Sequence, residues 1–318
     1  MARSGLSLWL VMFMYFCLCM GGCAARPNNT NPSYQTEPWD PRYPKTHCLV
    51  TEHYRIYTDF SDRDDLDHTA EVMEAAYRAY NTLWPIMPSD IPMRCFIFSN
   101  RGEWAAFTRK NAGQDAAVYL KINRGAYTVD DWFVAFWLGD QGTWSIIAHE
   151  GWHQFVARHC IGRLPPALEE GFACRFENIQ WPTDDSPYFD IHQSRARSQT
   201  LADAIASNRL WPLHELIRVH AGDVIYLPRE KIETFYAQSW AMSLFLLESY
   251  PSETRRYLAD VAAGRAYRPA AFANLKPNQW NPNLGQAQFE HYFERSMAEI
   301  ERDYTAYCYT LSRTATWR

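Results

Sequence analysis

Two histidines, His149 and His153, stand four positions apart in the stretch AHEGWHQF, and the residues around them are mostly apolar. Together with the glycine at position 162, this pattern predicts one helix from Thr143 to Cys160. Successive residues of a helix are rotated by about 100°, so the two imidazoles lie about 40° apart on one face. The helix therefore presents both side chains toward one point, with Glu150 to the side.

A histidine, a glutamate and a second histidine at this spacing form the HExxH pattern of zinc enzymes. In that pattern the two imidazoles bind Zn²⁺, and the glutamate is the general base toward a zinc-activated water. We therefore predict that His149 and His153 are zinc ligands and that Glu150 is the base. The alternative is an ordinary helix with two histidines near the core, and a third ligand distinguishes the two.

The third ligand follows either on the same helix or on the next one. His159 stands six positions after His153, as in metzincins, but Val156 replaces the glycine that breaks the helix in that class. On a continuous helix His159 points about 240° away from His153, which excludes it. The next helix begins in LPPALEEGFACRFE, where Glu169 and Glu170 both qualify by distance. Helical periodicity does not choose between them.

The stretch HEGWHQF followed by PPALEEGFA resembles the gluzincin pattern, in which the ligand is the glutamate directly before the glycine. This resemblance implies that Glu170 is the third zinc ligand and that Glu169 is a solvated charge on the helix face. Similarity to the peptidase MA-like domain extends to three further parts of the chain: TEHYRIYTDF, the long helix after it, and FYAQSWAMSLFLLESY. In particular, the chain resembles a bacterial family of unknown function whose members are often predicted lipoproteins, over residues 49–312.

The resemblance also implies roles for two further residues. A tyrosine or histidine outside the zinc helices donates to the oxyanion in gluzincins, and Tyr236 is the candidate here; the alternative is that it belongs to a packed helix face. Relatives often carry an acid four positions after the ligand glutamate, where Cys174 stands. In a helix hairpin Cys174 lies opposite His149, so we expect a buried thiol beside the zinc that is not bonded to Cys160.

The remaining pattern predicts an α+β protein with a small N-terminal sheet, one long helix and a mostly helical C-terminal half. The resemblance implies a thermolysin-like gluzincin fold in one domain, with the strand at 117–122 holding substrate as an added strand. Strands are expected at 49–60, 93–100 and 117–122. Helices are expected at 64–84, 101–110, 143–160, 196–207, 230–249, 252–263 and 286–311.

The first residues read as a targeting segment. Arg3 precedes an apolar run from Leu6 to Met20, which is shorter than the roughly 20 residues that span a bilayer. The following Gly-Gly-Cys resembles a lipobox, so we expect 1–23 to be a lipoprotein signal peptide with Cys23 acylated, and 24–48 to be a Pro/Asn-rich tether. The protein is then exported and anchored to a membrane of the cell envelope; the alternative is secretion in soluble form.

Charge and cysteine content exclude two other classes of protein. The chain has 31 basic and 36 acidic residues, so nothing indicates a nucleic-acid partner. Beyond Cys23 five cysteines remain without a CxxC pair, which excludes a cysteine zinc finger and allows at most two disulfides.

The sequence thus predicts a zinc-dependent metallopeptidase of the bacterial cell envelope acting on a peptide or protein substrate. The alternative is a catalytically weak or inactive zinc-binding envelope lipoprotein, a pseudoenzyme or a binding module. The cysteine at 174 supports this alternative, because a carboxylate there would orient a zinc histidine.

Overall fold

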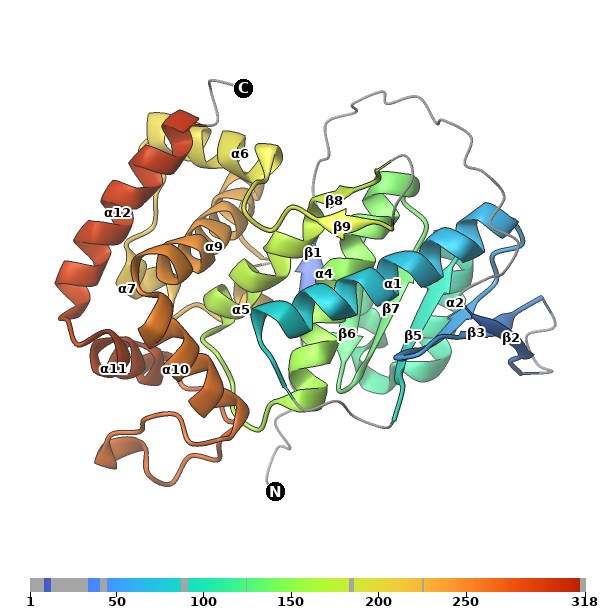
Figure 1. The fold of residues 1–318 in the computed structure, drawn as a ribbon, viewed down its shortest axis with the longest axis horizontal. Coiled ribbons are helices and arrows are strands. Elements are labelled where there is room, and N and C mark those ends of the chain that lie inside the picture. Colours follow the sequence, from blue (N-terminus) through green and yellow to red (C-terminus); the bar gives the residue numbers. More distant parts are fainter. Residues whose placement is uncertain are drawn as a thin grey trace. The chain divides into compact units, whose positions relative to one another are not determined.

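The computed structural model describes residues 9–12, 34–40, 45–86, 91–123, 125–182, 186–224 and 226–314. They form an α+β protein with an N-terminal sheet and a helical C-terminal half (Figure 1). The chain divides into two compact units, where we expected one domain. The sheet unit holds the described residues of Ser7–Arg158 and Phe176–Asp190, and the helical unit holds those of His159–Arg175 and Ile191–Arg318.

The sheet unit is built on a mixed sheet with the strand order β1-β6-β7-β5-β4-β3-β2. Strand β5 is parallel to both of its neighbours, β4 and β7. The other neighbouring pairs in the sheet are antiparallel. The strands are β1 (Trp9–Met12), β2 (Gln35–Pro38), β3 (His47–Val50), β4 (Tyr54–Thr58), β5 (Met93–Phe98), β6 (Gly125–Val129) and β7 (Trp132–Phe136), with a separate hairpin of β8 (Ile179–Gln180) and β9 (Tyr188–Phe189).

The helices of this unit are α1 (Arg63–Leu83), α2 (Arg101–Asn111), α3 (Ala116–Tyr119) and α4 (Asp140–His159), with a 3₁₀ turn η1 (Gly113–Asp115). The Asp62 side chain accepts from the backbone of Asp64 and caps α1, and Asn100 caps α2 in the same way. The predicted helices at 64–84, 101–110 and 143–160 and the predicted strand at 93–100 are confirmed.

Two neighbouring residues of β6 show how the helices cover the sheet. Thr128 donates a hydrogen bond to Glu150 on α4, whereas the Tyr127 hydroxyl donates to Thr108 on α2 at 3.0 Å. Because successive side chains of a strand point to opposite faces, α4 and α2 cover opposite faces of the sheet. Helix α1 connects the parallel strands β4 and β5, and Figure 1 shows it lying across the sheet.

Three expectations for this region are wrong. The stretch 49–60 forms two antiparallel strands, β3 and β4, instead of one. The stretch 117–122 is not a strand, because α3 and a turn occupy it. The stretch 24–48 is not a tether throughout, because 35–38 and 47–48 belong to strands β2 and β3.

The helical unit is arranged around α9 (Arg229–Ser249), against which α5, α6, α10 and α12 pack. The predicted helices at 196–207, 230–249 and 252–263 are confirmed. The expected helix at 286–311 is two helices, separated at Glu294, which has φ 52°. The other elements are α5 (Pro166–Ala173), α6 (Arg195–Ala206), α7 (Leu213–Leu216), α8 (Ala221–Val224), α10 (Pro251–Ala262), α11 (Pro282–Phe293), α12 (Met297–Thr314) and the 3₁₀ turn η3 (Ala270–Phe272). The 3₁₀ turn η2 (Cys174–Glu177) begins in the helical unit and ends in the sheet unit.

Within the described ranges, no helix combines the length and the apolar composition needed to cross a membrane. The predicted lipid-bearing Cys23 lies outside these ranges, as does the predicted signal peptide apart from the strand β1.

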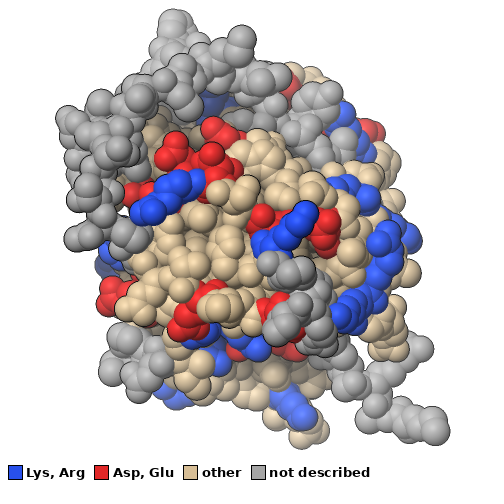
Figure 2. Space-filling model, turned by 90° about the vertical axis from the view of Figure 1, so that its right-hand side faces the viewer, with Lys and Arg blue, Asp and Glu red and all other residues tan. Residues whose placement is uncertain are grey.

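The five described cysteines form no disulfide, which confirms that Cys160 and Cys174 are not bonded to each other. Figure 2 shows acidic and basic side chains interspersed over the visible face.

Candidate metal centre

Helix α4 brings the two histidines together as its periodicity predicts. His149 and His153 are fully buried, and their Nε2 atoms lie 3.3 Å apart. Two nitrogen ligands bound to one tetrahedral Zn²⁺ at about 2.0–2.1 Å are separated by about 3.4 Å. The spacing of the two nitrogens therefore fits a single zinc ion between them.

His149 is held by a carboxylate on the side of the ring away from His153. Its Nδ1 atom lies 2.9 Å from Oε1 of Glu177, whose side chain is almost as buried. Because a carboxylate accepts hydrogen bonds, Nδ1 carries the proton and Nε2 keeps its lone pair. Glu177 thus orients the imidazole in the way that carboxylates commonly orient zinc histidines.

Glu177 is itself fixed by the sheet unit. The Ser145 hydroxyl, on the same helix as His149, donates to the Glu177 carbonyl at 2.6 Å. The preceding residue, Phe176, packs its ring against Tyr80 at 4.6 Å and Trp152 at 5.4 Å between centroids. The carboxylate therefore reaches His149 from an anchored segment.

Glu177 was not predicted from the sequence, because the pattern places the expected acid at position 174, one helical turn after Glu170. Helix α5 ends at Ala173, and the 3₁₀ turn η2 brings Glu177 to His149 instead. The only signal in the sequence was a third glutamate at the end of LPPALEEGFACRFE.

The predicted base, Glu150, is also fully buried in the sheet unit. Its Oε2 atom accepts a short hydrogen bond from the Thr128 hydroxyl of β6. One fixed hydrogen bond on a buried carboxylate restricts its rotamers, which is what a positioned general base requires. Sequence reasoning did not identify Thr128, because β6 itself was not predicted.

Gly151, between the two histidines, allows a close approach of α1. A Cβ atom at this position would lie 2.6 Å from the Tyr80 hydroxyl oxygen, and that hydroxyl donates to the carbonyl of Ala148. Burial raises the pKa of Tyr80 well above its ordinary value, with smaller contributions from Cys95 and Glu150, so the phenol stays protonated and donates. This contact fixes α1 against the turn that carries His149.

In the helical unit, Glu169 and Glu170 are both buried, so the expectation that Glu169 is a solvated charge is wrong. Their charges act on different neighbours. Burial lowers the pKa of the Arg163 guanidinium, and Glu169 opposes that shift. Burial and Arg163 lower the pKa of His220, and Asp223 and Glu170 oppose that shift. Glu169 thus lies near a cation, whereas Glu170 lies near an imidazole.

The glycine after Glu170 is explained by the packing of α5 on α9. A Cβ atom on Gly171 would lie 2.0 Å from the carbonyl oxygen of Ser239, so only glycine permits this crossing. The Ser243 hydroxyl donates to the Gly171 carbonyl at 3.0 Å. The Glu-Gly pair therefore marks the point where the two helices touch.

Two more predicted site residues lie in the helical unit. Tyr236 is buried on α9, with the Arg197 guanidinium carbon 5.3 Å from the centre of its ring. Cys174 is fully buried at the end of α5. The roles of Tyr236 and Cys174 toward the histidines of the sheet unit stay predictions, as does that of Glu170.

No family model matches the chain, and no curated protein matches it at a significant level.

Proposed function

We propose that this chain is a zinc-dependent metallopeptidase of the bacterial cell envelope, related to the gluzincins and sharing their thermolysin-like fold. The observation that carries the proposal is the buried pair of Nε2 atoms 3.3 Å apart on α4. The carboxylate on Nδ1 of His149 supports it, because it leaves the metal-binding nitrogen unprotonated. His149 and His153 would hold the ion together with Glu170.

The side chains that would surround the ion have different roles in the proposed hydrolysis. Zinc, when bound, supplies a Lewis acid that polarises the substrate carbonyl and lowers the pKa of water. Glu150 accepts the proton of the attacking water and passes it to the leaving amine, held in place by Thr128. Tyr236 donates a hydrogen bond to the oxyanion that develops on the substrate.

Strand β6 is the proposed binding edge for the substrate, in place of 117–122. In the sheet, β1 pairs with β6 in antiparallel register, with Trp9 opposite Thr128 and Met12 opposite Gly125. Residues 9–12 fall in the predicted signal peptide, and its removal would leave β6 as an open edge. An extended peptide can then add to this edge through main-chain hydrogen bonds. It would pass directly beside Thr128, and so beside the base Glu150.

The second candidate function, a weak or inactive zinc-binding lipoprotein, is less favoured. It depended on the missing acid at Cys174, and Glu177 supplies a carboxylate to His149 from another position. The proposed location is a membrane of the cell envelope, reached through a lipid anchor on Cys23.

Inhibition by a chelator tests the proposed function. The purified protein is incubated with a broad peptide library, with and without a zinc chelator, and cleavage is followed by mass spectrometry. We expect cleavage that the chelator abolishes and that added Zn²⁺ restores. Cleavage that survives chelation would exclude a metallopeptidase, and zinc binding without any cleavage would favour the second candidate.

A further inference from the structure

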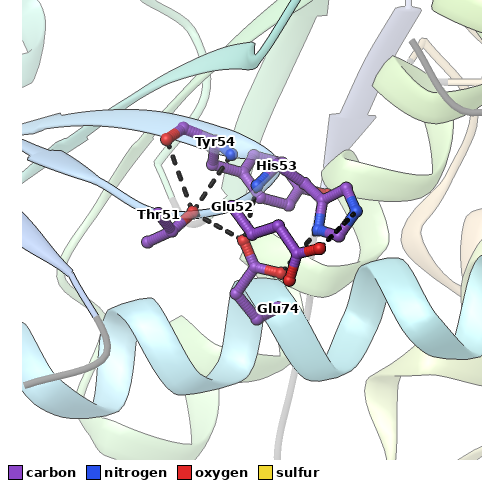
Figure 3. A network of polar contacts seen from close by, with 5 residues as sticks. All are labelled: Thr51, Glu52, His53, Tyr54 and Glu74. Carbon is purple, nitrogen blue, oxygen red and sulfur yellow. Dashed lines mark hydrogen bonds and ion pairs between the residues drawn. The ribbon is translucent and has the colours of Figure 1, made fainter. Parts of the chain in front are cut away.

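A second group of side chains at metal-binding spacing, Glu52, His53 and Glu74, lies at the turn between β3 and β4 and on α1 (Figure 3). Glu74 of α1 is buried and holds this turn. Its Oε1 atom accepts from the Thr51 hydroxyl at 2.6 Å and from the His53 backbone N–H at 2.9 Å. Its Oε2 atom lies 2.7 Å from Nδ1 of His53. Both carboxylate oxygens of Glu74 thus fix the turn and the imidazole.

The His53 ring is held in one orientation. It stacks on Tyr77 with the ring centres 3.7 Å apart and 19° between the planes. In the neutral ring, a proton on Nδ1 donates to Glu74 and the lone pair is then on Nε2. A carboxylate oxygen of Glu52 lies 4.0 Å from that Nε2 atom, and the Glu52 side chain is 82% exposed.

We infer that Nε2 of His53 and the carboxylate of Glu52 bind a divalent transition-metal ion, with Glu74 orienting the histidine. A histidine whose other nitrogen donates to a buried carboxylate is the usual arrangement of a metal ligand. Donor atoms on one tetrahedral ion are about 3.4 Å apart, so the exposed Glu52 needs to move by only about half an ångström.

The donor set also selects the kind of ion. One imidazole and one carboxylate suit Zn²⁺, Ni²⁺ or Cu²⁺ better than Mg²⁺ or Ca²⁺, which prefer oxygen ligands alone. Two protein ligands leave the other positions to water, so the ion exchanges with solvent. This centre is separate from the His149 pair and does not depend on the proposed function.

A second surface histidine provides a matched control. His214 also has its Nδ1 atom 2.8 Å from a carboxylate, that of Glu301. Among the residues that the structure describes, however, His214 belongs to no group of three side chains at metal-binding spacing, whereas His53 does. The comparison isolates the contribution of the Glu52 carboxylate.

The test is a calorimetric titration of the full chain with Zn²⁺ after removal of metal with a chelator. We expect Glu52→Gln and His53→Gln each to weaken the binding of one ion at least tenfold, and His214→Gln to weaken none. Glu52→Gln changes an exposed side chain, so its circular dichroism and melting temperature without metal should equal those of the parent.

Two results would overturn the inference. One is unchanged zinc binding in both Glu52→Gln and His53→Gln. The other is an equal loss in His53→Gln and His214→Gln, which would indicate unspecific binding to surface histidines. If the His149 pair did not bind zinc, Glu52→Gln would still be expected to weaken the binding of one ion. The two proposals can therefore be contradicted independently of each other.

Discussion

Oε1 of Glu177 lies 2.9 Å from Nδ1 of His149, although 28 positions separate the two residues in the chain. A carboxylate in this place fixes both the tautomer and the direction of the imidazole. The pair is formed within the sheet unit, where Ser145 and the ring of Phe176 hold the segment that carries Glu177.

We predict that Glu177→Ala lowers the affinity for zinc about 10–100-fold, because His149 loses the partner that orients it. The affinity is measured by competition with a chromogenic chelator. Glu103→Gln, an exposed change in the first turn of α2, is the control and should leave the affinity unchanged. Equal affinities of Glu177→Ala and the parent would show that the contact has no role in metal binding.

The two buried glutamates of α5 should respond differently to substitution. Glu170→Ala is expected to lose the zinc ion of the His149 pair. Glu169→Ala is expected to keep it but to lower the free energy of unfolding by about 1–3 kcal/mol, because the half-buried Arg163 loses a compensating charge. Measuring the metal content and the urea denaturation of both variants tests these two expectations. A metal-free Glu169→Ala beside a zinc-loaded Glu170→Ala would place the ligand one residue earlier.

Thr128→Val should reduce hydrolysis while zinc stays bound. The substitution keeps the shape of the side chain but removes the hydroxyl that donates to Glu150, so the base loses a fixed orientation. We expect kcat to fall about tenfold, less than the roughly 10²–10⁴-fold that general base catalysis contributes as a whole, because the carboxylate itself stays in place. Thr128→Ser, which keeps the hydroxyl, is the control. Full activity of the valine variant would argue against a positioning role for Thr128.

Cys23→Ser tests the predicted lipid anchor. If the residue is acylated, the variant should accumulate as an unprocessed precursor and lose the lipid mass at its N-terminus. Mass spectrometry of the membrane fraction detects both changes. An unmodified mature N-terminus at another position within residues 22–30 of the natural protein would exclude the anchor.

The parts of the fold that the sequence predicted are those set by local periodicity. Helices α1 and α4 carry apolar residues at helical spacing over 20 residues or more, and both lie where expected. The turn between β3 and β4 could not be predicted, because it contains neither glycine nor proline and is held by Glu74, more than 20 positions away. Glu294 likewise ends α11 in a left-handed conformation without a glycine to signal it.

In the candidate site, too, local periodicity was predictable from the sequence and contacts between distant segments were not. The pairing of His149 with His153 follows from one helical turn and was predictable. Glu177 and Thr128 reach the site through a 3₁₀ turn and through the pairing of β6 with β7, contacts that no local pattern encodes. The stretch 117–122 is wrongly predicted as a strand because the periodicity of a short apolar run does not distinguish a strand from a helix.

The most direct test of the account compares metal content and peptide hydrolysis in Glu150→Gln and the parent protein. Glutamine keeps the size of the side chain and its bond from Thr128 but cannot accept the proton of the attacking water. The account predicts that Glu150→Gln retains zinc at the parent's stoichiometry by elemental analysis and loses hydrolysis by about 100-fold or more. A variant that keeps the parent's rate, or one that has lost its zinc, would contradict the role assigned to Glu150 and with it the proposed mechanism.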